Sequence, residues 1–249
     1  MKPYYQDSSV TLYCADYREV LPSLPRADAI VTDPPYGETS LAWDVWPAGW
    51  PGEMTALAPQ LWCFGSMRMF WEHSADFADW KLAQDIVWEK HNGSSLHSDR
   101  FRRVHEFALH FYRGEWSSLH CRPPTVTVDD CGRGKIKRQG KPQHFGAIER
   151  EASYEYTGQR IMRSVIPVAS CHGYAVNETQ KPEGIIRPLL EYSIPPGGLV
   201  IDNFAGSGTV LAVARQLGMK AIGCEKRESQ CAEIVKRLSQ GDLFALPSA

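Results

Sequence analysis

The amino-acid sequence predicts an α/β fold built on a parallel sheet. In the last third of the chain, buried strand-like runs alternate with helix-like runs, which is the order of elements in a parallel α/β sheet. Two strand-like runs end in loops rich in Pro or Gly, at 33–37 and 204–208. The middle of the chain lacks a regular apolar period, which favours an insertion into this sheet.

The N-terminal part is expected to contribute five strands and one short helix or turn. The strands are predicted at 10–14, 27–32, 61–66, 85–89 and 106–112, and the helix or turn at 17–24, where Pro25 ends it. From about 113 to 174, Gly, Pro and basic residues interrupt every apolar run. The C-terminal part predicts helices at 182–193, 209–217 and 228–238 and strands at 199–203 and 220–225. Pro182 can open the first of these helices, and Pro188 is expected to kink it.

Composition limits the class of protein. The chain has 249 residues, of which 43% are hydrophobic and 22% charged, enough for one sizeable globular core. Its N-terminus lacks the pattern of a signal peptide, and no apolar run approaches the roughly 20 residues that cross a bilayer. The seven cysteines include no CxxC pair, and the His and Cys spacing matches no common zinc module. We therefore expect a cytoplasmic protein with reduced cysteines and without a metal.

Charge is distributed unevenly along the chain. Residues 100–163 carry a balance of +6, whereas the rest carries −8, although the whole chain is at −2. A basic middle between acidic flanks is typical of a lobe that meets a polyanion. A solvated loop with scattered charge is the alternative, and charge alone does not separate the two.

The glycine-rich loop Phe204–Gly208 follows the predicted strand that ends in Asp202 and Asn203. Ligands of open α/β sheets bind at the carboxyl ends of the strands, where glycines let the backbone approach closely. Glu225 ends the next strand, and its carboxylate could accept hydrogen bonds from both hydroxyls of a ribose. The loop matches neither GxGxxG nor GxxxxGK[ST], which argues against NAD and ATP. A tight strand-to-helix turn without a ligand is the alternative.

The tetrapeptide Asp33-Pro34-Pro35-Tyr36 follows another buried strand, and so is expected at the same edge of the sheet. An exocyclic base amine is a poor nucleophile because its lone pair is delocalised into the ring. Two acceptors aimed at its N–H groups, Asp33 and the carbonyl of Pro34, would favour the pyramidal geometry that frees this lone pair. The prolines fix the backbone, and Tyr36 offers a face for a flipped-out base. The alternative is a proline turn that only ends a strand.

Together, Asp33-Pro34-Pro35-Tyr36 and Phe204-Ala205-Gly206-Ser207-Gly208 resemble the motifs of the S-adenosylmethionine-dependent DNA amino-methyltransferases, which modify adenine N6 or cytosine N4. The catalytic motif precedes the cofactor loop, as in the permuted beta group of that family. The resemblance implies a Rossmann-like methyltransferase sheet with a circularly permuted motif order. It also implies two halves, 1–112 and 177–249, around a target-recognition insertion at 113–176. S-adenosylmethionine is the implied cofactor and double-stranded DNA the implied partner, with the target base flipped out of the duplex.

The resemblance also assigns residues. It implies catalytic roles for Asp33, Pro34, Pro35 and Tyr36. It implies cofactor contacts for Asp16, Thr179, Lys181, Asp202, Asn203, Phe204, Ala205, Gly206, Ser207, Gly208, Thr209 and Glu225. Two departures concern the local backbone: the family commonly has proline at the position of Asn203, and Pro188 is unusual in the helix after Lys181.

The sequence also supports expectations about the target base and about the residues that contact DNA. Asp33 favours adenine, since Ser at that position is more usual in cytosine-N4 enzymes, which are the alternative. Protein glutamine methyltransferases have Asn there, and a DNA-binding module that lost catalysis would not be expected to keep the whole motif. For DNA binding we expect two basic clusters, Arg100, Arg102 and Arg103, and Arg133, Lys135, Lys137 and Arg138. A homodimer, and a role in restriction-modification or as an orphan enzyme, are further expectations.

Overall fold

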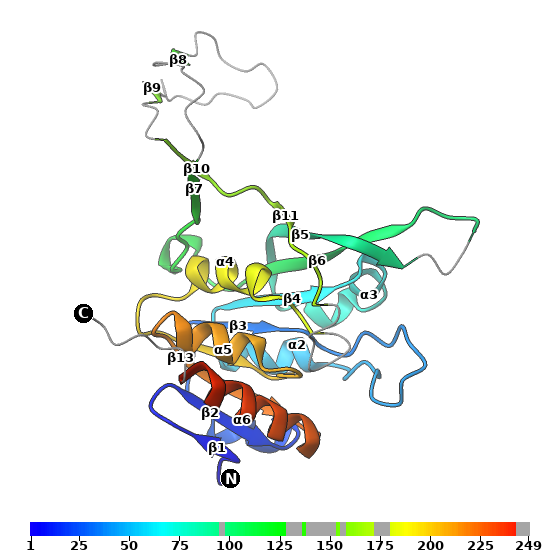
Figure 1. Ribbon diagram of the computed structural model, residues 1–249, viewed down its shortest axis with the longest axis vertical. Helices are drawn as coiled ribbons and strands as arrows, with labels where there is room; N and C mark the ends of the chain where they lie inside the picture. Colours follow the sequence, from blue (N-terminus) through cyan, green and yellow to red (C-terminus); the bar gives the residue numbers. More distant parts are fainter. Residues whose placement is uncertain (95–97, 128–135, 138–152, 155–157, 172–179, 243–249) are drawn as a thin grey trace. The chain divides into compact units, whose positions relative to one another are not determined.

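The computed structural model describes residues 1–94, 98–127, 136–137, 153–154, 158–171 and 180–242 (Figure 1). The chain folds into two compact units. The first is formed by residues 1–122 and 164–249, and the second by residues 123–163. The sequence-based boundaries at 112/113 and 176/177 stay a prediction, because much of the predicted insertion lies outside the described residues.

The first unit is built on a sheet that has nine strands in the described part of the chain, in the order β1-β2-β13-β12-β3-β4-β6-β5-β11. The bounds are β1 Tyr5–Gln6, β2 Val10–Cys14, β3 Ala29–Thr32, β4 Gln60–Gly65, β5 Lys81–Ser94, β6 Arg103–Tyr112, β11 Val165–Pro167, β12 Leu199–Asp202 and β13 Lys220–Glu225. The central run from β2 to β4 is parallel throughout. β6 and β5 add an antiparallel hairpin, and β11 is parallel to β5. The predicted strand at 85–89 is therefore the middle of a much longer one.

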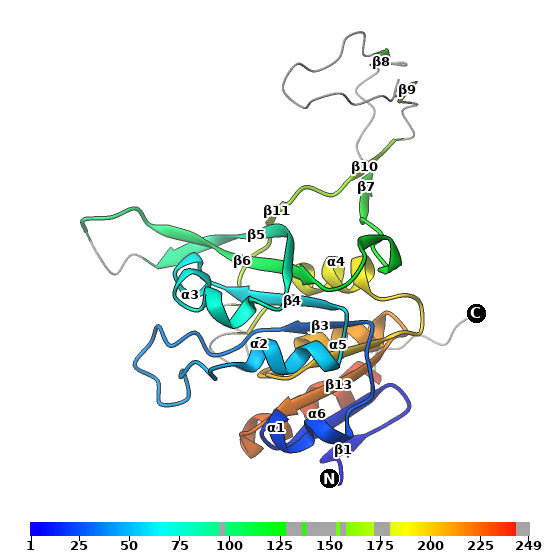
Figure 2. The ribbon, with the colours of Figure 1, turned by 180° about the vertical axis from the view of Figure 1, so that it is seen from behind.

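Helices cover both faces of this sheet. Figure 1 shows α4 (Glu183–Ser193), α5 (Thr209–Gln216) and α6 (Glu228–Asp242) on the near face. The view from behind in Figure 2 shows α1 (Tyr17–Val20), α2 (Trp50–Glu53) and α3 (Met67–Glu72) on the other. Short 3-10 turns η1 (Leu21–Ser23), η2 (Met54–Ala56), η3 (Ser74–Phe77) and η4 (Trp116–Ser118) complete the helical segments. This arrangement confirms the predicted α/β class.

The strand order positions the site. β12 lies between β13 and β3. The chain runs from β12 to β13 in one direction along the sheet, and from β3 to β4 in the opposite direction. A crevice at the carboxyl ends of the strands is expected where the direction of the connections changes. All four residues of β3 are buried, as are Val200, Ile201 and Asp202 of β12. Two buried strands, which carry the two sequence motifs, thus end side by side.

The second unit contains two short strand pairs among its described residues. β7 (Thr125–Thr127) pairs with β10 (Gln159–Ile161), and β8 (Ile136–Lys137) with β9 (Ser153–Tyr154), both antiparallel. None of the helices in the described parts of the two units has the length and hydrophobicity that a membrane span requires. Pro188 lies inside the continuous helix α4, and the kink expected there stays a prediction.

Candidate functional site

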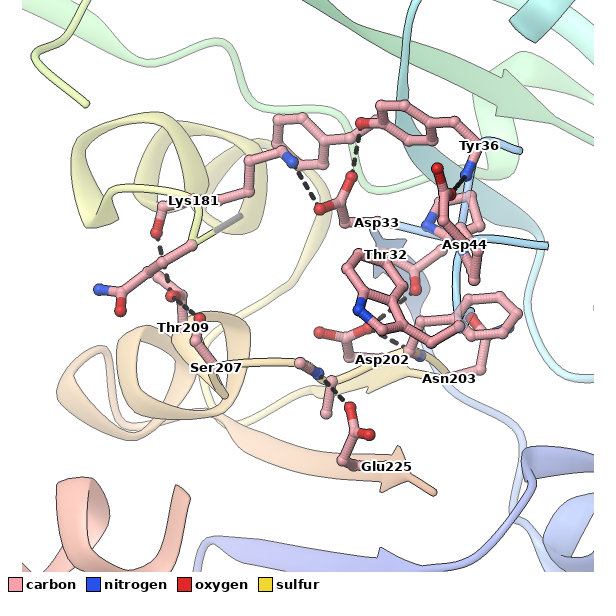
Figure 3. Close-up of a pocket in the computed structure, with 18 of the residues that line it drawn as sticks. Thr32, Asp33, Tyr36, Asp44, Lys181, Asp202, Asn203, Ser207, Thr209 and Glu225 are labelled. Atoms are coloured by element: carbon pink, nitrogen blue, oxygen red, sulfur yellow. Dashed lines mark hydrogen bonds and ion pairs between the residues drawn. The ribbon is translucent and has the colours of Figure 1, made fainter. Parts of the chain in front are cut away.

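A cavity of about 1410 Å³ opens at the carboxyl ends of β3, β12 and β13 in the first unit. Cavities for one drug-sized ligand have volumes of about 300–1,000 Å³, so this one has room for more than one small molecule. Figure 3 shows that side chains from both sequence motifs line it. The predicted site residues in its wall are Asp33, Pro34, Pro35, Tyr36, Arg103, Lys181, Asp202, Asn203, Phe204, Ala205, Gly206, Ser207, Thr209 and Glu225.

The glycine loop forms one wall and requires its glycines for two reasons. Gly206 and Gly208 have φ angles of 51° and 70°, a left-handed conformation that disfavours other residues. A Cβ atom on Gly208 would also lie 2.9 Å from Cγ2 of Ile234, so α6 packs directly against the start of α5. The Gly206 N–H donates to Glu225 Oε2 at 3.0 Å, which fixes the loop against the end of β13.

Two carboxylates flank this loop. Asp202 is 3% exposed, and its Oδ1 accepts hydrogen bonds from Thr32 Oγ1 at 2.8 Å and from the Phe204 N–H at 3.2 Å. Burial raises the pKa of Asp202 to about 7, in spite of these bonds. Glu225 Oε1 accepts hydrogen bonds from the backbone N–H and from Nε of Arg227, at 2.9 and 3.0 Å. The carboxylate can accept about four hydrogen bonds in all, so it has capacity left for a ligand.

Asn203 is the clearest sign of a ligand in this wall. The side chain is 2% exposed, and neither Oδ1 nor Nδ2 has a hydrogen-bond partner within the described residues. Buried polar atoms are nearly always satisfied, so a ligand with both donors and acceptors fits here. S-adenosylmethionine has both, in its amino acid and nucleoside parts. The residues present therefore fit the cofactor that the motifs imply.

Some predicted cofactor residues lie elsewhere. Asp16 does not line the cavity, although its neighbours Ala15 and Tyr17 do. Its carboxylate instead caps α1 through the Arg18 N–H at 3.0 Å and pairs with Lys226 at 2.6 Å. Gly208 does not line the cavity, and Thr179 lies outside the described residues.

The opposite wall carries Asp33, and both of its carboxylate oxygens have partners. Tyr36 donates its hydroxyl to Oδ1 at 2.6 Å, and Nζ of Lys181 lies 2.5 Å from Oδ2 (Figure 3). Burial raises the pKa of Asp33, and the Lys181 ammonium opposes this rise. Burial lowers the pKa of Lys181, but attraction to the Asp33 and Glu106 carboxylates outweighs this effect. The pKa of Lys181 is therefore raised. The sequence predicts Lys181 as a cofactor residue; the structure places its ammonium group against Asp33, and the predicted role stays a prediction.

Asp44, which sequence reasoning missed, fixes the backbone after the two prolines. Its carboxylate accepts hydrogen bonds from the N–H groups of Tyr36, Gly37, Glu38 and Thr39, at 2.7, 2.9, 3.1 and 2.8 Å. These bonds outweigh burial and hold the pKa of Asp44 below its usual value. The loop that carries Tyr36 is thus held by one side chain that is 6% exposed.

Glu106, also missed, lies behind Lys181 on β6. Its Oε1 forms an ion pair with Lys90, and its Oε2 lies 3.4 Å from Nζ of Lys181. Burial favours the protonated form, but the two ammonium groups outweigh it and lower the pKa of Glu106 to about 2. The charges of Lys90, Glu106, Lys181 and Asp33 therefore alternate along one wall of the cavity. The only sequence signal for Glu106 was a carboxylate within an alternating strand.

The predicted DNA contacts are described in part. Arg100 pairs with Asp99 at 3.3 Å, and Arg102 donates to the carbonyl of Gly93 at 3.0 Å. Arg103 lines the cavity and lies 3.7 Å from Glu38. Phe101, between these arginines, is fully exposed. Arg133, Lys135 and Arg138 and the side chain of Lys137 lie outside the described residues.

The described part of the chain has no group of three or more His, Cys, Asp or Glu side chains that could hold a metal ion.

The chain is similar to known proteins in sequence and in fold. The model of the family N6_N4_Mtase, described as DNA methylase, matches residues 27–236. Type II methyltransferase M2.LlaDCHI of Lactococcus lactis subsp. cremoris is 37% identical, with 98% of this chain and 95% of that protein aligned. Type II methyltransferase M.HinfI of Haemophilus influenzae is 24% identical over 72% of this chain. The chain spans about half the length of M.HinfI and of a further curated relative.

Solved structures share the fold. The M1.HpyAVI-SAM complex has a TM-score of 0.63 at 22% identity, covering 92% of this chain and 100% of that one. PvuII DNA methyltransferase, titled cytosine-N4-specific, has a TM-score of 0.64 at 16% identity, covering 100% of this chain and 90% of that one. These likenesses confirm the Rossmann-like methyltransferase fold. The family uses S-adenosylmethionine, which confirms the predicted cofactor. The chain belongs to the N6/N4 family of DNA methylases.

Proposed function

We propose that this chain is a site-specific DNA methyltransferase that transfers a methyl group from S-adenosylmethionine to N6 of adenine in double-stranded DNA, with the target base flipped out. One observation carries this proposal: the Asp33 carboxylate and the glycine loop line the same cavity, from adjacent buried strands. The cavity volume of about 1410 Å³ leaves room for a cofactor and a base together.

The residues around Asp33 would prepare the amine. Asp33 accepts a hydrogen bond from one N–H of the exocyclic amine, and the carbonyl of Pro34 accepts one from the other. Pro34 and Pro35 restrict the backbone, and Asp44 fixes the N–H groups that follow. The Tyr36 hydroxyl, 2.6 Å from Asp33, holds its ring beside the carboxylate, where a base can stack. A positive charge that develops on the amine nitrogen is then stabilised by Asp33.

The residues around the glycine loop would hold the cofactor. Bound S-adenosylmethionine supplies a methyl group on a sulfonium centre. Glu225 accepts a hydrogen bond from a ribose hydroxyl, and the buried amide of Asn203 forms hydrogen bonds with polar groups of the cofactor. Gly206 lets the backbone approach closely. The backbone carbonyl of Lys181 accepts the Thr209 hydroxyl at 3.0 Å, which ties the segment carrying the lysine to the start of α5.

Adenine is favoured over cytosine by the residue type at position 33. A carboxylate at this position is typical of adenine enzymes, and Ser of cytosine-N4 enzymes. The fold likeness to the cytosine-N4-specific PvuII enzyme keeps cytosine as the alternative. A protein glutamine substrate is less well supported, since Asn would be expected in place of Asp33. The motif order, with Asp33 before Gly206, is that of the permuted beta group.

The DNA surface would begin at the β5–β6 hairpin. Lys90, Arg103 and Glu106 line the cavity, and the hairpin continues from them to Arg102, Phe101 and Arg100. Basic side chains there would contact phosphates beside the flipped base. We also propose that the second basic cluster, 133–138, contacts the DNA backbone and that the enzyme forms a homodimer. A monomer at micromolar concentration, measured by light scattering, would contradict the dimer.

The test is to treat unmodified genomic DNA with the purified chain and S-adenosylmethionine and to map modified bases by single-molecule sequencing. The proposal expects modification at one short sequence motif, and none with Asp33→Ala as the control. Unmodified DNA with the wild-type chain, with cofactor binding intact, would contradict the proposed substrate.

A further inference from the structure

Each oxygen of the Asp33 carboxylate already has a partner before any base arrives. Nζ of Lys181 lies 2.5 Å from Asp33 Oδ2, and the Tyr36 hydroxyl lies 2.6 Å from Oδ1. An amine that binds Asp33 must share these oxygens with an ammonium group in direct contact. That ammonium is also unfavourable beside the reacting nitrogen, since this nitrogen gains positive charge as it takes up the methyl group.

Glu106 provides a second position for the Lys181 ammonium. Oε2 of Glu106 lies 3.4 Å from Nζ of Lys181. Within the described residues, this oxygen accepts no hydrogen bond. A hydrogen bond between an ammonium and a carboxylate has a length of about 2.8 Å. A movement of Nζ by about 0.6 Å would therefore turn this contact into a direct hydrogen bond.

Glu106 is itself held in place from the other side. Lys90 forms an ion pair with Oε1, and the Lys90 ammonium lies 4.4 Å from the centre of the Trp88 ring. Both glutamate and lysine are only about a fifth exposed, at 17% and 22%. The acceptor for Lys181 is thus preorganised and remains charged, as the pKa of Glu106, lowered to about 2, also indicates.

We propose that Glu106 is a positioning residue that draws the Lys181 ammonium away from Asp33 when the target amine binds. In the free enzyme Lys181 contacts both carboxylates, and its positive charge opposes the effect of burial on Asp33. When the amine donates to Asp33, Lys181 shifts toward Glu106. Asp33 then faces the amine without an ammonium group in direct contact, and Glu106 neutralises Lys181 in its new position. This inference rests on the proposed methyl transfer, whose substrate class it does not change.

The test compares Glu106→Gln with the wild type on a duplex that contains the mapped site. The variant keeps the shape of the side chain and removes its charge. We expect kcat to fall by about 10- to 100-fold, the range for outer-shell groups that orient metal ligands, with the KM for DNA and the Kd of S-adenosylmethionine within about threefold. The control is Glu72→Gln, which removes an exposed ion pair with Arg68 and should leave kcat unchanged. A kcat within twofold of the wild type for Glu106→Gln would overturn the inference.

A double-mutant cycle separates this role from a merely structural one. If Glu106 acts through Lys181, adding Glu106→Gln to Lys181→Met should lower kcat no further than Lys181→Met alone. If the two substitutions instead lowered kcat by independent factors that multiply, Glu106 would not act through Lys181. If Glu106→Gln does not fold, Lys90→Met/Glu106→Gln removes both charges of this half-buried pair and should show the same loss of kcat.

Two results distinguish failure of this inference from failure of the proposed function. A wild-type chain that methylates no DNA overturns both. An active wild type, crystallised with its target duplex and an unreactive cofactor analogue, tests the movement itself. The inference predicts that Nζ of Lys181 lies at hydrogen-bond distance from Glu106 Oε2, about 2.8 Å, and farther from Asp33 Oδ2 than the 2.5 Å seen here. Distances in that complex that stay at 2.5 Å to Asp33 and 3.4 Å to Glu106 would overturn it.

Discussion

Thr32 donates its hydroxyl to Asp202 at 2.8 Å, although 170 residues separate the two in the sequence. The bond joins the last residue of β3 to the last residue of β12, just before the chain enters the Asp33 motif and the glycine loop. Both residues are almost fully buried, at 1% and 3% exposure. The two functional loops are thus fixed to one another at their bases, and a change at Asp202 is expected to affect stability as well as the site.

The first prediction concerns the pH dependence of stability. The pKa of Asp202 is about 7 in the fold, above its ordinary value of 3.8, so the folded chain holds a proton that the unfolded chain releases. The free energy of unfolding should therefore fall as pH rises from about 4 to 7. Asp202→Asn lacks this dependence. Between pH 5 and pH 8, its stability relative to the wild type should rise by about 2–3 kcal/mol, measured by urea unfolding. A stability difference independent of pH would contradict the raised pKa.

The second prediction concerns catalysis. Asp33→Ala should abolish methyl transfer while leaving the affinities for cofactor and DNA largely intact, because the lost interaction matters mainly in the transition state. Lys181 keeps Glu106 as a partner in this variant, which limits the loss of stability. Single-turnover methylation and calorimetry with the cofactor are the measurements. If more than about a tenth of the wild-type rate survived, Asp33 would not hold the amine as proposed.

The third prediction concerns the cofactor. Glu225→Ala should weaken S-adenosylmethionine binding by about 1.5–3 kcal/mol, the range for hydrogen bonds to a charged group. The loss would include the bond from Gly206 that fixes the glycine loop. Calorimetry measures the affinity, and Asp33→Ala serves as the control that should change it much less. Unchanged affinity for Glu225→Ala would mean that the ribose binds elsewhere.

The fourth prediction compares the two basic clusters. Each phosphate contact adds about 0.9 to the slope of log affinity against log salt concentration. Replacing Arg133, Lys135, Lys137 and Arg138 with alanine should lower the magnitude of this slope by up to about 3.6, without changing cofactor affinity. Replacing Arg100, Arg102 and Arg103 with alanine should lower the magnitude of the slope by less than about 2.7, since these side chains already have partners within the chain. An unchanged slope for the first set would assign the DNA surface to the second.

Local sequence patterns predicted much of the sheet. The strands at Val10–Cys14 and Lys220–Glu225 have the predicted bounds, because their apolar runs are bounded by polar or turn residues. The glycine loop and the Asp33 motif were predicted at one edge of the sheet and line one cavity. α3 was not predicted: six residues, Met67–Glu72, carry too short a period to recognise.

The charged wall of the site could not be predicted from sequence. Lys181 and Asp33 are 148 residues apart, and only the packing of β6 against β4 brings Glu106 behind them. The period of apolar residues does not indicate such a contact. The sequence around Lys181 and Pro182 likewise did not indicate that the lysine contacts Asp33. The four bonds that Asp44 accepts likewise depend on how its loop turns back.

The most direct test of the central claim is the identity of the methylated nucleoside. Unmodified DNA is incubated with the purified chain and S-adenosylmethionine that carries a deuterated methyl group, then digested to nucleosides and measured by mass spectrometry. The Asp33 assignment predicts labelled N6-methyladenine, which disappears with Asp33→Ala. Labelled N4-methylcytosine would contradict the adenine assignment, and the absence of any labelled nucleoside would contradict DNA methylation itself.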